Sequence, residues 1–153
     1  TFEAAGMKVT ACELNHPIVT HGYRIEDDGA VFVFATDNEL VTLEETGPAG
    51  ELLRLSRKSL VDWCAGADLL GHDAQFSVEE YQAHVGWGHS TFDDALLLAQ
   101  EAGASQLAFV HHDPGHSDAD IDALVEQALG NHRHGGGKEL IAFPAAEEQE
   151  IVL

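Results

Sequence analysis

The chain has 153 residues, of which 44% are hydrophobic and 22% are charged, a balance typical of one folded domain with its own core. Its 27 acidic residues outnumber the 7 basic ones and give a formal net charge of −20. Such a surface repels phosphate backbones and argues against a nucleic-acid partner, although adaptation to high salt would also explain the acidity. No apolar run is long enough to cross a bilayer, so no membrane partner is expected.

The first part of the chain carries strand patterns. Alternating or β-branched runs predict strands over Lys8–Glu13, Gly22–Glu26 and Ala30–Ala35. Asp28-Gly29, between the last two runs, is a strong hairpin signal. The Gly and Pro content of Glu45–Glu51 predicts a loop.

The rest of the chain alternates between helix and strand patterns. Ser77 with Glu80 three residues later is a capping box, which predicts a helix start. The stretch NHRHGGGK, residues 131–138, predicts a flexible connector. The remaining expected elements are a helix over Leu52–Cys64, a strand within Asp68–Ala74, a helix from Ser90 or Thr91 to Gly103, a strand over Gln106–Val110, a helix over Asp118–Leu129, and a final strand pair, Glu139–Phe143 with Glu150–Leu153. Strands first and then alternating elements predict a layered α/β domain with a mixed sheet.

Metal-capable side chains occur where the predicted strands end. Open sheets place their sites at the carboxyl ends of strands, and imidazoles and carboxylates converging there suit a hydrolytic metal centre. Each residue alone has a structural alternative, such as a turn hydrogen bond or a helix start, so only their co-occurrence is a signal. The candidates are His16, Asp37, His72, His89 and His111.

The two cysteines bear on the cellular compartment. Cys12 and Cys64 lie far apart and show no CxxC spacing. They indicate reduced, structural thiols and a cytoplasmic location.

Five segments, in this order and spacing, resemble the C-terminal half of a metallo-β-lactamase-fold hydrolase: NHPIVTHGYRI, VFATDNE, LLGHDAQF, GWGHST and LAFVHHDPGHSD. They are similar to the phosphodiesterase branch, which includes ribonuclease Z and the cyclic-nucleotide phosphodiesterase-like proteins, and GWGHST with HHDP favours the second group. The resemblance runs from about Lys8 to the end of the chain. It implies that residues 1–153 form half of a four-layered αββα sandwich, a mixed sheet with helices on one face.

The resemblance also implies roles for individual residues. His16 would bind one metal ion, His111 would bind a second, and Asp37 would bridge both around the hydroxide that attacks phosphorus. His89, paired with Asp73, would protonate the leaving group, because an adjacent acid fixes the imidazole tautomer and raises its basicity. Zinc is the first expectation for the two divalent ions, with manganese or iron as alternatives.

The chain departs from the family pattern in one respect. The HxHxDH motif, which supplies most of the family's metal ligands, is absent from these 153 residues, as is the N-terminal half of the sandwich. We expect a part of a longer enzyme, as the Thr1 start suggests; one half of a two-chain enzyme and a stand-alone domain without catalysis are the alternatives. In each case an apolar sheet face would pack on the missing half or on another copy.

The resulting functional prediction is a metal-dependent hydrolase of phosphodiester bonds that acts on a small substrate such as a cyclic nucleotide. The isolated chain is expected to bind metal weakly and to show little or no activity. The alternative is a non-catalytic metallo-β-lactamase-like binding module with an incomplete metal site. A third reading, an acidic histidine-rich protein that buffers metal, is disfavoured because the histidines follow strand ends rather than cluster.

Overall fold

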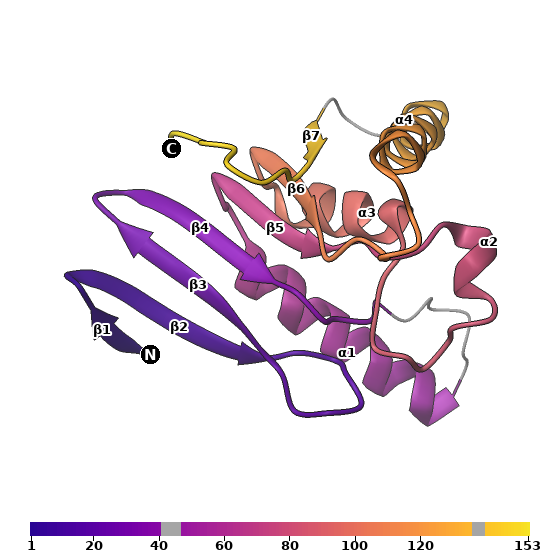
Figure 1. Ribbon diagram of the computed structural model, residues 1–153. Helices are drawn as coiled ribbons and strands as arrows, with labels where there is room; N and C mark the ends of the chain where they lie inside the picture. The colour runs from indigo at the N-terminus through magenta and orange to yellow at the C-terminus, as the bar shows by residue number, and fades with distance from the viewer. Residues whose placement is uncertain (41–46, 136–139) are drawn as a thin grey trace.

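The computed structural model describes residues 1–40, 47–135 and 140–153 (Figure 1). Within these residues, seven strands form one sheet and four helices accompany it. The elements are β1 Phe2–Ala4, β2 Met7–Glu13, β3 His21–Asp27, β4 Ala30–Ala35, α1 Gly47–Cys64, β5 Leu69–Asp73, α2 Val78–Tyr81, α3 Phe92–Ala102, β6 Gln106–Val110, α4 Asp118–His134 and β7 Ile141–Pro144.

The strands lie in the sheet in the same order as in the chain, from β1 to β7. Strands β1 to β4 pair antiparallel as a meander, and the turn between β3 and β4 is made by Asp28 and Gly29, both with positive φ. Strands β4 to β7 pair parallel. The predicted mixed sheet is therefore confirmed.

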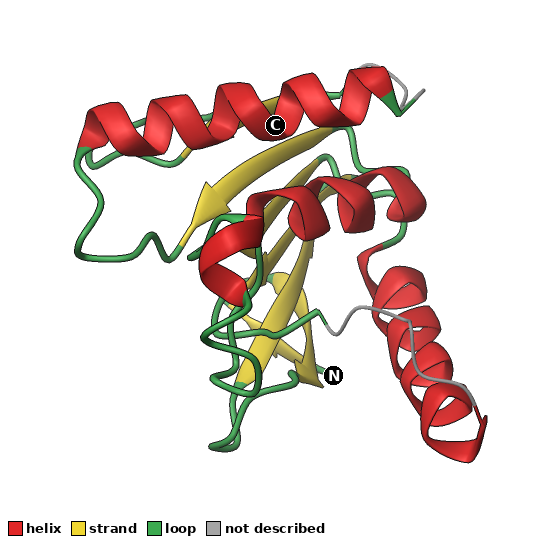
Figure 2. Cartoon of the chain, turned by 90° about the vertical axis from the view of Figure 1, so that its right-hand side faces the viewer, coloured by secondary structure: helices red, strands yellow, loops and turns green. Residues whose placement is uncertain are grey.

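Helices α1, α3 and α4 cover one face of the sheet, as Figure 2 shows. A crossover between parallel strands is right-handed, and the connections through α1, α3 and α4 all step the chain in the same direction across the sheet. These connections therefore place their helices on the same side. The α/β fold with helices on one face is confirmed.

The core lies between this helix layer and the sheet. Strand β5 is buried along its whole length, and α3, in the middle of the helix layer, packs on β5 and β6 and on both neighbouring helices. Its start and end follow the expected signals, since Thr91 caps the first turn and Gly103 ends the helix in a left-handed conformation. The largest fully buried side chains include Leu70, Leu96, Leu98, Leu107, Phe92 and Phe109.

The other face of the sheet carries no helix and exposes large apolar side chains. The register sets Tyr23 opposite Phe34, and antiparallel partners point to the same side. We call this side the open sheet face. Its most exposed large residues are Phe2, Tyr23, Phe34 and Ile141, between 39% and 63% exposed.

Several predicted boundaries are corrected by the structure. The predicted strand Glu150–Leu153 is wrong, because β7 instead pairs parallel with β6; Glu139, the first residue expected in its partner strand, lies outside the described residues. In the predicted loop Glu45–Glu51, residues 47–51 belong to α1 and residues 45 and 46 lie outside the described part. Pro48 is tolerated there because the first N–H groups of a helix have no partner within it.

The predicted connector at residues 131–138 is also partly helical. Asn131 to His134 complete α4, and residues 136–138 lie outside the described part of the chain. His132, Arg133 and His134 fall in the last turn, where cationic side chains interact favourably with the helix dipole. Among the described residues, no helix combines the length and the hydropathy that a membrane span requires.

Candidate metal centre

The strand ends gather the predicted site residues at one edge of the sheet. Strands β2, β4, β5 and β6 run in the same direction, so their carboxyl ends share this edge. His16 lies in the loop after β2, Asp37 follows β4, Asp73 ends β5 and His111 directly follows β6. His89 reaches the same edge from the loop between α2 and α3.

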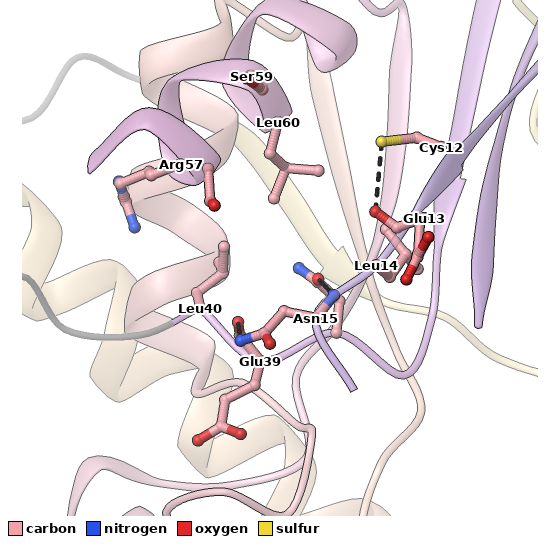
Figure 3. A pocket seen from close by; sticks show the side chains of 11 residues that line it. Cys12, Glu13, Leu14, Asn15, Glu39, Leu40, Arg57, Ser59 and Leu60 are labelled. Atoms are coloured by element: carbon pink, nitrogen blue, oxygen red, sulfur yellow. Dashed lines mark hydrogen bonds between the residues drawn. The ribbon is translucent and has the colours of Figure 1, made fainter. Parts of the chain in front are cut away.

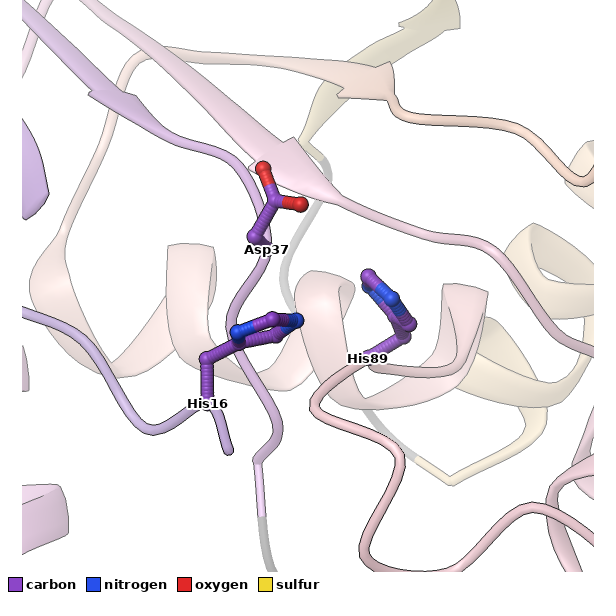
Figure 4. Close-up of side chains that lie close together, drawn as sticks. All are labelled: His16, Asp37 and His89. Carbon is purple, nitrogen blue, oxygen red and sulfur yellow. The ribbon is translucent and has the colours of Figure 1, made fainter. Parts of the chain in front are cut away.

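The ligand-capable atoms form two overlapping groups. His16, Asp37 and His89 come from three separate loops and surround one space (Figure 4), with one donor atom from each within 4.8 Å of the others. Asp73, His89 and His111 make a second group by the same distance. Asp37 connects the two groups, since its Oδ1 lies 3.6 Å from Nε2 of His111. His89 belongs to both groups.

His89 is oriented by Asp73. Its Nδ1 donates to Oδ2 of Asp73 at 2.7 Å, so Nε2 is the atom left for a metal or a substrate. This hydrogen bond, opposed by partial burial, raises the pKa of His89, and the negative charges of Asp73 and Asp37 act in the same direction. The His111 ring stacks on the His89 ring, with centroids 4.8 Å apart.

Asp73 itself is fully buried and held by three donors. Oδ2 also accepts from the backbone N–H of Asn38 at 3.2 Å, and Oδ1 accepts from the backbone N–H of Ser90 at 3.1 Å. Both carboxylate oxygens therefore already accept hydrogen bonds. This geometry favours Asp73 as the residue that positions His89 over a role as a metal ligand.

Asn38, buried next to Asp37, ties the loops together. Its Oδ1 accepts from the backbone N–H of Asn15 at 3.0 Å, and its carbonyl accepts from the Ser90 hydroxyl. Its Nδ2 donates to Nε2 of His72 at 3.0 Å, while Nδ1 of His72 donates to the backbone carbonyl of Asp73 at 2.8 Å. Burial lowers the pKa of His72, so this imidazole is neutral. His72, a candidate from its position after a strand, thus has a structural role below the site.

Glu39 shapes the loop that carries His89. Its Oε1 accepts from the Tyr81 hydroxyl at 2.7 Å and from the Gly86 N–H at 2.7 Å, and its Oε2 accepts from the Gly88 N–H at 3.0 Å. Burial and the hydrogen bond to Glu39 raise the pKa of Tyr81. Neither Asn38 nor Glu39 could be identified from the sequence, because an Asn and a Glu after a strand resemble any polar loop.

Gly88 allows the His16 loop to approach. It has φ of +96°, and a Cβ at this position would lie 2.1 Å from Cδ2 of His16. Nδ1 of His16 lies 3.0 Å from the Ile18 carbonyl and 3.2 Å from the Ile18 N–H, so its Nε2 is also the atom left for a ligand. In the sequence, the second glycine of GWGHST is the signal for this contact, because a glycine can indicate a close approach of the backbone to another segment.

A cavity of about 480 Å³ lies nearby, between the end of β2 and α1 (Figure 3). Leu14, Leu40 and Leu60 give it an apolar wall, and the Cys12 thiol donates to the Glu13 carbonyl at its rim. None of the histidines described above lines it. Asn38 and Glu39, which hold the loops of the candidate metal centre, also line the cavity, so the cavity adjoins that centre.

A mixed sheet with helices on one face and histidines and carboxylates at its carboxyl edge agrees with the expected metallo-β-lactamase-like domain. The family model of the β-lactamase superfamily domain matches residues 1–112. The chain belongs to this superfamily.

Two solved structures show the same fold. The metallo-β-lactamase fold protein YhfI from Bacillus subtilis matches with a TM-score of 0.64 and 18% identity, over 94% of this chain and 48% of that protein. The short form of human tRNase Z matches with a TM-score of 0.53 and 24% identity, over 74% of this chain and 38% of the human one.

Curated relatives in sequence are ribonucleases Z. That of Oceanobacillus iheyensis is 26% identical over 161 residues, which cover 83% of this chain and 53% of the relative. That of Brevibacillus brevis is 32% identical over 91 residues, which cover 60% of this chain and 26% of the relative. The chain spans about half, or less, of the length of these relatives.

These relatives contradict one prediction. The net charge of −20 predicts that a nucleic-acid partner is unlikely, yet the relatives are ribonucleases, and a ribonuclease acts on RNA. The physical reason is that net charge describes the whole surface, whereas the binding of a phosphodiester depends on the local field at one edge of the sheet.

Proposed function

We propose that this chain carries part of the active site of a metal-dependent phosphodiester hydrolase. The observation that carries the proposal is the convergence of His16, Asp37, His89 and His111 from four loops on one edge of the sheet, with Asp73 orienting His89. The ribonuclease relatives support the class of bond, because ribonucleases cleave phosphodiesters.

The donor set fits divalent metal ions. Imidazole nitrogens and a carboxylate suit zinc first, with manganese or iron as alternatives. His16 would hold one ion and His111 a second, and Asp37 would contribute a carboxylate to both. Bound ions would act as Lewis acids and lower the pKa of the attacking water.

The described residues alone would give each ion two protein donors. Zinc usually takes three or four ligands, so the site needs further donors from outside the described residues. The missing donors agree with the proposal that residues 1–153 are the C-terminal half of a larger sandwich. The isolated chain should accordingly bind metal weakly and show little or no turnover.

His89 is the proposed proton donor. Asp73 holds Nδ1, so a protonated His89 carries its transferable proton on Nε2, and a ring nitrogen of His89 lies within 4.8 Å of ligand atoms of His16 and Asp37. The raised pKa increases the protonated fraction near neutral pH. Transfer of this proton to the departing alkoxide oxygen would avoid a poor leaving group.

The finer substrate prediction, a small phosphodiester such as a cyclic nucleotide, remains a proposal beside the RNA of the ribonuclease relatives. Competition between a cyclic nucleotide and a short unstructured RNA for the same site would show which of the two substrates is preferred.

The free thiols of Cys12 and Cys64 support a reducing compartment such as the cytoplasm.

A non-catalytic binding module is the second candidate, and the absence of HxHxDH from these 153 residues favours it.

The deciding experiment measures metal content and hydrolysis of a chromogenic phosphodiester by the complete protein. Asp37→Ala should lower kcat/KM at least about 100-fold, since bridging carboxylates hold both ions. Asp62→Ala, an exposed acid on α1, is the matched control and should leave turnover unchanged. Full activity in Asp37→Ala would overturn the hydrolase proposal.

A further inference from the structure

Two loops beside the candidate metal centre expose large apolar side chains. One loop follows His16 and the other precedes His89. Gly88 brings them together, because its backbone packs against the His16 ring. We call the exposed residues of these loops the apolar rim: Ile18, Val19, Val85 and Trp87, between 60% and 73% exposed.

The Trp87 indole is held in place yet remains open to solvent. It makes an edge-to-face contact with His84, with ring centroids 4.7 Å apart and planes at 89°. His84 in turn stacks on Phe76 at 4.4 Å, and Phe76 contacts His89 edge to face at 6.2 Å. Trp87 therefore belongs to a row of rings that leads to the proposed proton donor, and 60% of its surface is exposed.

The loops around the site contain no cationic side chain. Residues 14–20, 36–40, 73–92 and 110–118 include neither Lys nor Arg. A nucleotide bound at this edge therefore has no ammonium or guanidinium group of these loops to hold its phosphates. The loops offer ring faces and apolar surface instead, and these can add to the affinity for a metal-bound phosphate.

We propose that Trp87 is a specificity-determining residue that stacks against the nucleobase next to the scissile phosphate. Trp87 precedes His89 by two residues, so both side chains project from the same short loop beside the candidate metal centre. The substrate class is a phosphodiester that carries an unpaired base, because a paired base has no free face. This inference rests on the proposed phosphodiesterase function.

The first test compares two substrates that share a chromophore. Thymidine 5′-(p-nitrophenyl phosphate) carries a base, whereas methyl p-nitrophenyl phosphate does not. With the metal-loaded complete protein, Trp87→Ala should raise KM for the thymidine ester roughly tenfold, leaving kcat and the methyl ester unchanged. Trp87→Phe should retain most of the affinity, and Leu97→Ala, an exposed residue on α3, is the control for lost apolar surface.

The second test needs no turnover. The chain has two tryptophans, so Trp63→Phe leaves Trp87 as the only indole and Trp87→Phe leaves Trp63. Thymidine monophosphate should quench the fluorescence of the first variant and not of the second. Ribose 5-phosphate, which has no base, should quench neither.

The outcomes separate this inference from the proposed function. Equal loss of both substrates in Trp87→Ala, or absence of quenching by the nucleotide, overturns the stacking role even where Asp37→Ala abolishes turnover. A shift of oligomeric state in Trp87→Ala with an unchanged ratio of the two substrates would assign the apolar rim to a protein interface and also overturn it. If the wild type hydrolyses neither ester, the proposed function fails, and the fluorescence experiment still decides the role of Trp87.

Discussion

At the scale of single residues, hydrogen bonds to Nδ1 orient two imidazoles of the candidate metal centre. Asp73 accepts from Nδ1 of His89, and the backbone of Ile18 contacts Nδ1 of His16. Each ring is therefore left with Nε2 as its metal-binding or proton-donating atom. Asp73 and Ile18 thus determine which ring nitrogen each histidine offers to the site, although neither residue is proposed to contact the substrate.

Gly88 allows a direct test of this orientation. Gly88→Ala would place a methyl group 2.1 Å from the His16 ring and would also strain a backbone with φ of +96°. Gly86→Ala is the matched control, because Gly86 has φ of +84° and no neighbour within 4 Å of the added Cβ. Both variants should lose about 1 kcal/mol of stability from the left-handed backbone. Only Gly88→Ala should also weaken zinc affinity, by tenfold or more, as measured by calorimetry; equal zinc affinities would contradict the assignment of His16.

His72 makes stability depend on pH. Burial lowers the pKa of His72 in the folded chain, whereas in the unfolded chain the pKa of this residue is about 6.5. The unfolded state therefore binds the proton first, and the contribution of His72 is complete above pH 6.5 and is lost as pH falls, by up to about 1.4 kcal/mol per pH unit.

Urea unfolding between pH 7 and pH 5 measures this effect. In His72→Gln, the free energy of unfolding should decrease less between pH 7 and pH 5 than in the wild type, whatever its value at pH 7. His21→Gln, at an exposed position of β3, should keep the wild-type slope. Identical slopes in all three proteins would mean that His72 is not held neutral.

At the scale of elements, local signals identify a structure where its cause is local. The Asp28-Gly29 turn needs positive φ at both residues, and Ser77 with Glu80 forms the expected capping box at the start of α2. The pairing of β7 with β6, and the absence of a strand over Glu150–Leu153, depend on partners far along the chain. No pattern within either segment could indicate them.

The same distinction holds for the candidate site. His16, Asp37, His89 and His111 could be selected because strand ends and family motifs mark them. Asn38 and Glu39 could not, since their importance lies in hydrogen bonds to Asn15, His72 and the loop before His89. Such contacts exist only once the loops have been brought together.

Helix α3 provides a prediction at this scale. Leu98 is fully buried in the core between the helices and the sheet, whereas its neighbour Leu97 is 44% exposed. Leu98→Ala should lower the free energy of unfolding by about 2–5 kcal/mol, because it removes apolar contacts and leaves a cavity. Leu97→Ala should cost less than about 1 kcal/mol. Comparable urea midpoints for the two variants would show that α3 packs differently.

At the scale of the whole molecule, the two faces of the sheet differ in how far they are covered. One face of the sheet is covered by helices, and the open sheet face exposes Phe2, Tyr23, Phe34 and Ile141. Exposed apolar surface of this kind marks an interface. We therefore propose that the open sheet face packs on the missing half of the sandwich, or on a second copy where that half is absent.

Sedimentation of the isolated chain tests this proposal. Phe34→Glu should weaken self-association at least about tenfold, since a carboxylate must be desolvated in the interface. Leu97→Glu places the same charge at a comparably exposed position on the opposite side and should leave association unchanged. A wild-type chain that stays monomeric at high concentration would show that the open sheet face does not associate with another copy.

The backbone at Asp37 and His111 has a consequence for the evolution of this domain. Both residues adopt left-handed conformations, with φ of 53° and 60°, which glycine adopts with less strain. Selection for thermal stability alone would thus favour glycine at the two positions that carry proposed metal ligands. A laboratory screen that selects for heat resistance and ignores turnover should therefore accumulate glycine at these two positions. The proposed metal ligands would then be lost while the fold is kept.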